Sequence, residues 1–200
     1  HYTVNELIEF EGLYYPNHII NNIEIWEYLS YSILHSGFFH LINNIFAILL
    51  FGSYLEIKYK WYRIFTIYTL SCIGSSIIYC TIHKLLYNNN TIVLIGASGG
   101  AFGLMGSLIS EFYLNWEKFN NKSGRIILIF FILLSHLSEY IIKDSNIASG
   151  AHLGGLVYGI SPAVLYLPNY KYEYYEWIFI VFAIIINLFY FIICPIYLYI

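Results

Sequence analysis

Long apolar stretches dominate this chain and constrain its fold more than any other feature. A helix that crosses the hydrocarbon core of a bilayer needs roughly 17–25 consecutive, mostly apolar residues. Six stretches meet this requirement, at approximately 38–56, 61–85, 97–116, 125–142, 148–167 and 177–199. Only 10% of the 200 residues are charged, whereas a soluble domain has about a quarter. The sequence therefore predicts an all-α, polytopic membrane helical bundle with six spans.

The segment before the first apolar stretch has a different character. Acidic and amide side chains interrupt every apolar run there, at positions 6, 9, 11, 17, 21, 22, 24 and 27. We expect residues 1–25 to be a non-cytoplasmic loop or the remnant of an upstream segment. Residues 26–200 are expected to form the membrane domain.

Lysine and arginine are distributed unequally between the two ends of the predicted spans. One side has only Lys84 and Lys143, and the other has seven: Lys58, Lys60, Arg63, Lys118, Lys122, Arg125 and Lys171. The positive-inside rule makes the second side cytoplasmic. His40, Ser98 and His152 lie near the starts of the first, third and fifth spans, so they are predicted at similar depth near the non-cytoplasmic side.

Several protein classes are disfavoured by the composition. A net charge of -3, with nine basic residues spread among the spans, argues against a nucleic-acid partner. The histidines do not form the His-x-x-x-His pattern of a zinc protease, and Asp144 is the single aspartate, so an aspartyl intramembrane protease is also disfavoured. The three cysteines lack metal-ligand spacing and are predicted to be buried, small apolar residues. We expect no metal and no cofactor.

Gly96-Ala97-Ser98-Gly99 is the first of two segments with catalytic potential. A polar group at membrane depth is costly, which makes it a candidate functional residue. Glycines allow a tight turn into a helix, whose free amide N–H groups can bind an oxyanion. A serine becomes a nucleophile when a base accepts its proton. Taken alone, however, this motif is better explained as a small-residue helix contact.

Ala151-His152-Leu153-Gly154-Gly155 is the second segment. Gly155 and Gly159 share one helix face with His152 and form a Gly-x-x-x-Gly motif. Gly99 and Gly103 form another such motif in the serine helix, so the two helices are predicted to approach closely. A lone intramembrane histidine is more often a structural hydrogen-bonding group, but at the same depth as Ser98 it is better explained as the catalytic base.

His40 and Asn44 are four residues apart and therefore face the same way on a helix. Two such donors could complete an oxyanion hole, or they could hold helices together. His35 and Asn43 are interpreted as structural. Phe102 follows Ser98 by four residues and either supports the His152 ring or belongs to the core, the core being the safer interpretation. Acidic residues near span ends are interpreted as structural, namely Glu56, Glu111 and Glu139.

Five blocks in order resemble the rhomboid intramembrane serine proteases, over about residues 24–200. They comprise 26–29 with His35 and the His-x-x-x-Asn segment 40–44; the Gly-x-x-Leu-Glu segment 52–56; residues 63–71; the serine block 96–103; and the histidine block 151–155 with Gly159. The resemblance implies Ser98 as nucleophile and His152 as general base and acid. It implies that His40, Asn44 and the Ser98 amide stabilise the oxyanion, with Gly96, Gly99, Phe102, Gly155 and Gly159 in supporting positions.

The resemblance also implies a function in the membrane. Substrates would be single-span membrane proteins, cut in or near the span within a water-filled cavity open to the non-cytoplasmic face. No acidic residue is obviously placed to orient His152, so a Ser–His dyad is expected. The secretory pathway or plasma membrane is favoured over the mitochondrial inner membrane.

Two departures from the family pattern stand out. The Trp-Arg motif of the first loop is Trp26-Glu27 in this sequence, and the first span of the family is absent and expected upstream of His1. The stretch 177–199 would then be a seventh span. The main alternative is a catalytically silent relative that binds membrane clients, although such relatives typically lack the serine or the histidine. A transporter would instead have ionisable residues along a path through the membrane.

Overall fold

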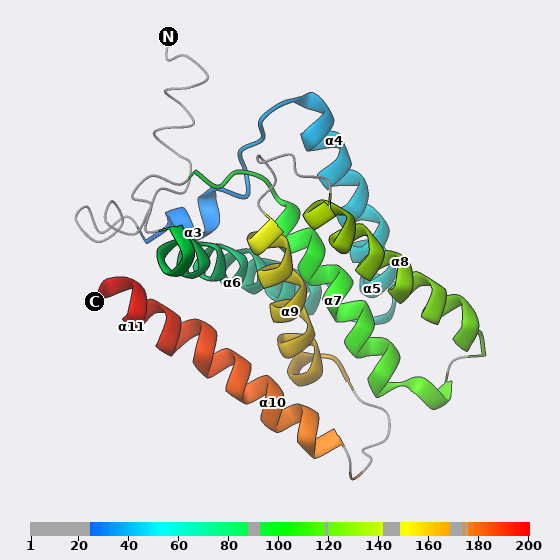
Figure 1. Ribbon diagram of the computed structural model, residues 1–200. Coiled ribbons are helices and arrows are strands. Elements are labelled where there is room, and N and C mark those ends of the chain that lie inside the picture. Colours follow the sequence, from blue (N-terminus) through cyan, green and yellow to red (C-terminus); the bar gives the residue numbers. More distant parts are fainter. Residues whose placement is uncertain (1–24, 88–92, 119, 142–148, 169–173, 175) are drawn as a thin grey trace.

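The computed structural model describes residues 25–87, 93–118, 120–141, 149–168, 174 and 176–200, and these are predominantly helical (Figure 1). The elements are α3 (Glu27–Ser30), α4 (Phe38–Ala47), the π-helix η1 (Ile48–Gly52), α5 (Ser53–Lys58), α6 (Trp61–Tyr87), α7 (Ser98–Leu114), the 3-10 helix η2 (Trp116–Lys118), α8 (Lys122–Ile141), α9 (Ser149–Tyr166), α10 (Glu176–Leu188), the π-helix η3 (Phe189–Ile193) and α11 (Cys194–Tyr199). The all-helical prediction is confirmed. The predicted segment 1–25 lies outside the described residues except for Ile25.

The described part of each of the six predicted apolar stretches forms a helix or a set of consecutive helices. Counting described residues alone, three of them are long and apolar enough to cross a membrane, namely Phe38–Lys58, Trp61–Leu86 and Glu176–Tyr199. The other three correspond to α7, α8 and α9, which have 17, 20 and 18 residues. The molecule is a membrane protein, while the count of six crossings stays a prediction.

Helices α7 and α9 form the centre of the bundle (Figure 1). Their backbones touch where the two Gly-x-x-x-Gly motifs predict it: a Cβ atom on Gly155 would overlap the carbonyl oxygen of Gly99, and one on Gly159 would overlap that of Gly103. Small residues allow this approach, and close packing replaces the hydrophobic driving force that is missing between helices in lipid. The contact brings the starts of the two helices together.

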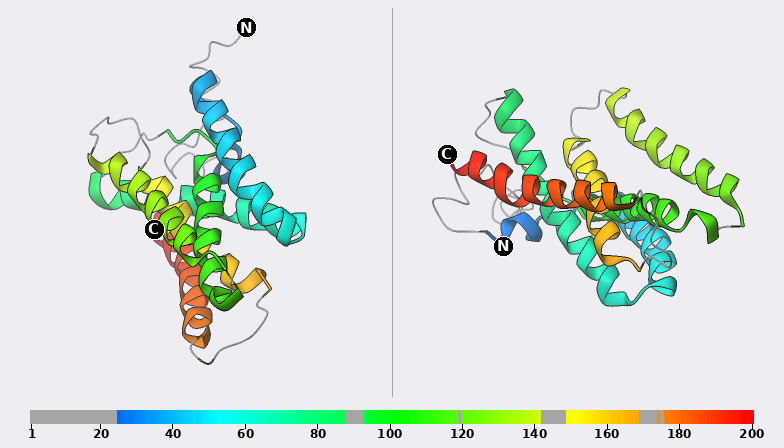
Figure 2. Two further views of the ribbon diagram at one scale, coloured as in Figure 1. Left: turned by 90° about the vertical axis from the view of Figure 1, so that its right-hand side faces the viewer. Right: turned by 90° about the horizontal axis from the view of Figure 1, so that it is seen from below.

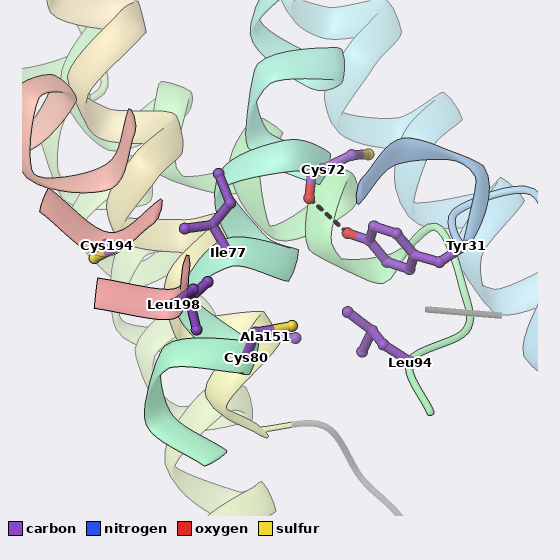
Figure 3. Packing of buried hydrophobic residues seen from close by; sticks show 8 residues of the cluster. All are labelled: Tyr31, Cys72, Ile77, Cys80, Leu94, Ala151, Cys194 and Leu198. Atoms are coloured by element: carbon purple, nitrogen blue, oxygen red, sulfur yellow. Dashed lines mark hydrogen bonds between the residues drawn. The ribbon is translucent and has the colours of Figure 1, made fainter. Parts of the chain in front are cut away.

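Helix α6 packs against both central helices through small polar side chains. The Ser75 hydroxyl donates a hydrogen bond of 2.6 Å to the carbonyl oxygen of Ala151, and Tyr31, from the segment before α4, donates one of 2.8 Å to the carbonyl oxygen of Cys72. Figure 3 shows the hydrogen bond from Tyr31 to Cys72 and the buried cluster to which both residues belong. Cys72, Cys80 and Cys194 are buried and unpaired in disulfides, which confirms their prediction as small apolar residues.

The C-terminal rod α10–η3–α11 lies on the other side of the bundle from α4 and α8 (Figures 1 and 2). It is fastened to α9 by polar contacts: Tyr158 donates a 2.7 Å hydrogen bond to Asn187 Oδ1, and Ser161 donates one of 2.9 Å to the Ala183 carbonyl oxygen. Lys84, near the end of α6, donates to the carbonyl oxygen of Tyr197 at 2.8 Å. The rod is therefore anchored to the bundle at its middle and at its C-terminal end.

Helix α4 continues through η1 into α5 as a single rod with a π-helical turn in its middle. The π-turn has i→i+5 hydrogen bonds and so contains one more residue per turn than an α-helix. It separates the half that contains His40 and Asn44 from the half that contains Tyr54 and Lys58. Gly52, the last residue of the π-turn, is buried, and a Cβ atom there would lie 3.4 Å from Leu104 of α7.

The α5 half of this rod is tied to α7 by a buried carboxylate. Glu111 has a side chain that is only 1% exposed, and it forms ion pairs with Lys58 at 2.6 Å and with Arg125 of α8 at 3.3 Å. Tyr59 also donates to it, and Tyr54 accepts hydrogen bonds from both cations. The interpretation of Glu111 as structural agrees with this network, which joins three helices at the end of α7 far from Ser98.

Replacing Glu111 with alanine is expected to destabilise the protein by about 3 kcal/mol, because two cations would face each other without their shared anion. The value lies at the lower end of the range for buried pairs because both cations are partly exposed and can be hydrated. Glu117→Ala is the matched control, since Glu117 is 86% exposed and 3.9 Å from Lys122; such a pair contributes about 0–1 kcal/mol. Unfolding by sodium dodecyl sulfate in mixed micelles measures the free energy of unfolding of both variants. Equal losses in Glu111→Ala and Glu117→Ala would contradict the prediction.

Candidate active site

Ser98 and His152 are in hydrogen-bond contact. Ser98 is the first residue of α7, and His152 lies in the first turn of α9. The distance from His152 Nε2 to Ser98 Oγ is 2.7 Å, and both residues are partly buried. The two residues, 54 positions apart in sequence, meet because the glycine contact aligns the starts of the two helices. A nucleophile and a base at this distance are typical of covalent catalysis.

Phe102 supports the histidine ring. Its own ring stacks on that of His152 with centroids 4.5 Å apart and planes inclined by 15°. Phe102 is 8% exposed and is also packed against Leu156. Of the two interpretations suggested by the sequence, both therefore apply: the residue is in the core, and it contacts the face of the imidazole. A stacked ring fixes the plane in which His152 can accept a proton.

The turn before Ser98 depends on Gly96. This residue has a φ of 116°, a backbone conformation that side chains with a Cβ atom rarely adopt. Its N–H donates a 3.0 Å hydrogen bond to the carbonyl oxygen of Tyr31. A Cβ atom at Gly96 would lie 2.8 Å from His40 Nε2 and 3.5 Å from Asn44 Nδ2. The serine turn and the two predicted oxyanion donors therefore lie against each other.

Asn44 faces this turn and Asn43 does not, as their spacing from His40 predicts. Asn44 is 6% exposed, whereas Asn43 is exposed on the outside of α4. The buried Asn44 Nδ2 atom makes no hydrogen bond with the part of the chain that is described. A buried donor without a partner is costly, and a ligand that accepts a hydrogen bond would satisfy it. Together with the N–H groups at the start of α7, it can stabilise a negatively charged oxygen.

The contact between Ser36 and His40 was not predicted from the sequence. The Ser36 hydroxyl lies 3.0 Å from His40 Nδ1. Ser36 precedes His40 by four residues but lies before the start of α4, so helical spacing alone does not predict the contact. His35, interpreted as structural, lies edge-on to the His40 ring with centroids 5.2 Å apart, and its Nε2 accepts a 3.4 Å hydrogen bond from the Ala97 N–H. His40 is thus held from two sides.

Trp26 and Glu27, which stand where the family has Trp-Arg in the first loop, differ in burial. Trp26 is 60% exposed, while Glu27 is 1% exposed where α3 packs on α6. The next residue, Tyr28, accepts a 2.9 Å hydrogen bond from Ser76 at its carbonyl oxygen. Burial raises the pKa of the Tyr28 phenol above its ordinary value, and the nearby Glu27 carboxylate adds to this effect. The loop is therefore packed on the bundle beside the site.

Comparison with known proteins identifies similar sequences over most of the chain. The family model described as Rhomboid domain matches residues 22–169. Rhomboid-like protease 1 of Toxoplasma gondii is 30% identical over 178 residues, which cover 88% of this chain and 58% of that protein. RHOMBOID-like protein 1 of Arabidopsis thaliana is 30% identical over 158 residues, covering 79% of this chain and 39% of that protein.

The name of a third relative includes a cellular compartment. RHOMBOID-like protein 6, mitochondrial, of Arabidopsis thaliana is 32% identical over 141 residues, covering 70% of this chain and 43% of that protein. The chain spans less than two thirds of the length of each of these three relatives.

Proposed function

Because this chain belongs to the rhomboid family, we propose that it is an intramembrane serine protease that cleaves single-span membrane proteins in or near their transmembrane segment. The observation that carries the proposal is the 2.7 Å contact between His152 Nε2 and Ser98 Oγ at the start of two packed helices. Rhomboid-like protease 1 is named as a protease, which agrees with it. The proposed site uses side chains and backbone amides alone.

In the proposed mechanism, Ser98 Oγ attacks the carbonyl carbon of the scissile bond while His152 Nε2 accepts the hydroxyl proton. The carbonyl oxygen becomes an oxyanion, which Asn44 Nδ2, His40 Nε2 and the Ser98 N–H stabilise. His152 then donates its proton to the leaving amine, and the peptide bond breaks to give an acyl-enzyme. Water hydrolyses the ester with His152 acting first as base and then as acid. With no carboxylate assigned to the imidazolium, turnover is expected to be slow.

The substrate must unwind before it can react. A transmembrane helix satisfies its backbone N–H and C=O groups internally, so its peptide bonds are inaccessible within the bilayer. Local unwinding would present one carbonyl to Ser98, and helix-breaking glycine or proline in the substrate should favour it. The unequal distribution of lysine and arginine supports a site toward the non-cytoplasmic side. We propose the secretory pathway or the plasma membrane as the location, in preference to the mitochondrial inner membrane.

Labelling with a fluorophosphonate probe tests the proposal without knowledge of the substrate. The full-length protein in membranes is compared with Ser98→Ala and His152→Ala, and both substitutions are expected to abolish labelling. Ser107→Ala is the matched control, because Ser107 lies in the middle of the same helix and its hydroxyl donates to the Gly103 carbonyl oxygen at 2.9 Å. Labelling that survives in Ser98→Ala would refute the proposal. Absence of labelling in the folded wild type would favour a silent, client-binding relative.

Ser36→Ala is expected to lower kcat about tenfold with little change in KM. When the Ser36 hydroxyl donates to His40 Nδ1, the neutral imidazole carries its proton on Nε2, toward the oxyanion. His40→Ala removes the donor itself and is expected to cost about 10²–10³-fold. The measurement is cleavage of a reconstituted substrate as a function of pH. Ser32→Ala is the control, since the Ser32 hydroxyl donates to the Leu29 carbonyl oxygen at 2.7 Å and not to His40. If Ser32→Ala lowered kcat as much as Ser36→Ala, the proposal that Ser36 positions His40 would be wrong.

A further inference from the structure

Two hollows adjoin at the end of the bundle where the turn between α5 and α6 meets the end of α9. The first has a volume of about 470 Å³ and the second about 480 Å³. Arg63 and Pro168 line both of them, so the two form a continuous depression. It lies at the opposite end of α9 from His152 and is therefore separate from the proposed active site.

The first hollow is basic. Its lining includes three cations, Lys58, Lys60 and Arg63, and a single acidic residue, Glu56. Lys58 already pairs with Glu111, and Arg63 Nη1 donates a 2.7 Å hydrogen bond to the Tyr166 carbonyl oxygen. Arg63 is thus held in place across the hollow with donors to spare, because a guanidinium has five. A positively charged hollow with a fixed arginine is suited to a phosphate group.

The ends of two candidate spans predict that the hollows lie at the depth of the lipid headgroups. One apolar segment long enough to cross the membrane ends at Lys58, and the next begins at Trp61. Trp61 and Tyr62 are 65% and 49% exposed at this end, and aromatic residues of this kind are enriched where membrane meets water. The ligand that is most abundant at this depth is the phosphate of a phospholipid.

The second hollow is suited to the part of a lipid below its phosphate. Its lining is mixed: Tyr62, Leu165 and Leu167 contribute apolar atoms, and Arg63 and Thr66 contribute polar ones. We infer that the two hollows together bind one anionic phospholipid, with its phosphate on Lys60 and Arg63 and its glycerol and upper acyl chain against Leu165. The cations select a net negative headgroup, since a zwitterionic lipid carries a compensating positive charge. This inference does not depend on proteolysis.

Native mass spectrometry of the full-length protein, purified in detergent and titrated with phosphatidylserine, tests the inference. Wild type is expected to retain one phosphatidylserine and to bind phosphatidylcholine at least tenfold more weakly. A basic residue near a membrane surface contributes about 1 kcal/mol, so Lys60→Gln with Arg63→Gln is expected to weaken binding about 30-fold. Lys60→Gln alone, on an exposed turn residue that does not threaten the fold, is expected to weaken it about fivefold.

The matched control is Lys118→Gln with Lys122→Gln, which removes two cations that do not line either hollow. Binding that remains within twofold of wild type in this control supports the site. An equal loss in both double variants would overturn it in favour of non-specific charge attraction. Glycerol 3-phosphate is added as a competitor to test for a soluble ligand. If it fully displaces phosphatidylserine at equal concentration, the ligand is a soluble phosphate and the lipid assignment is wrong.

Discussion

Replacing Ser98 with alanine is expected to lower the rate of substrate cleavage by about 10⁴-fold or more, and replacing His152 with alanine by a similar factor. Without Oγ the acyl-enzyme cannot form, and without Nε2 the hydroxyl keeps its proton, so each change removes the same step. The rates are measured on a reconstituted single-span substrate, with the folded state of each variant checked by thermal unfolding.

The double variant gives a sharper readout. Groups that act as one unit are strongly non-additive, so Ser98→Ala with His152→Ala should be no slower than Ser98→Ala alone. Additive losses would mean that the two residues act in separate steps, and the 2.7 Å contact would then lack the proposed meaning. Retention of wild-type cleavage by either single variant would contradict the mechanism outright.

Gly155→Ala is expected to reduce cleavage by about 10²-fold, although residue 155 touches neither reacting atom. The added methyl group would overlap the Gly99 carbonyl oxygen in the adjacent helix, so α7 and α9 must separate. A misplacement of about 1 Å can cost about 10²-fold in rate, and the separation acts directly on the distance between Ser98 and His152. Fluorophosphonate labelling and substrate cleavage should fall together.

Gly150→Ala is the control for this substitution. It places the same methyl group in the first turn of the same helix, where the nearest atom is Cδ1 of Ile82 at 3.3 Å, the mobile end of a side chain. Alanine is favoured over glycine in helices by about 1 kcal/mol, so this variant should be active and no less stable than wild type. If Gly155→Ala were as active as Gly150→Ala, the glycine contact would not set the geometry of the site.

The helices and the pairing of Ser98 with His152 could be predicted because both follow from regular patterns. Apolar stretches mark helices wherever the chain lies in lipid, and equal depth together with two glycine motifs brings two specified helix faces together. The choice of Asn44 over Asn43 needs only helical spacing. These features depend on the order of residues along one element, which the sequence states directly.

The partners of Glu111 and the role of Ser36 could not be predicted in this way. Lys58 and Glu111 are 53 positions apart, and their contact requires the angle at which the α4–α5 rod crosses α7. Ser36 reaches His40 through the conformation of a short segment outside any helix. The buried position of Glu27 likewise follows from how α3 lies on α6, and charge alone would place this residue in water.

The π-turn at Ile48–Gly52 gives the α4–α5 rod one extra residue without changing the rotation of its two halves. Leu49 and Leu50 are 60% and 53% exposed, so most apolar residues could replace them without loss of packing. Deleting one of them would let the π-turn close as an ordinary α-turn, because a π-turn contains one more residue, and the helix beyond it would keep its rotation. Lys58 would still face Glu111, and Asn44 would keep its place at Gly96. The rod can therefore lose one residue at this point while each of its ends keeps its own partners.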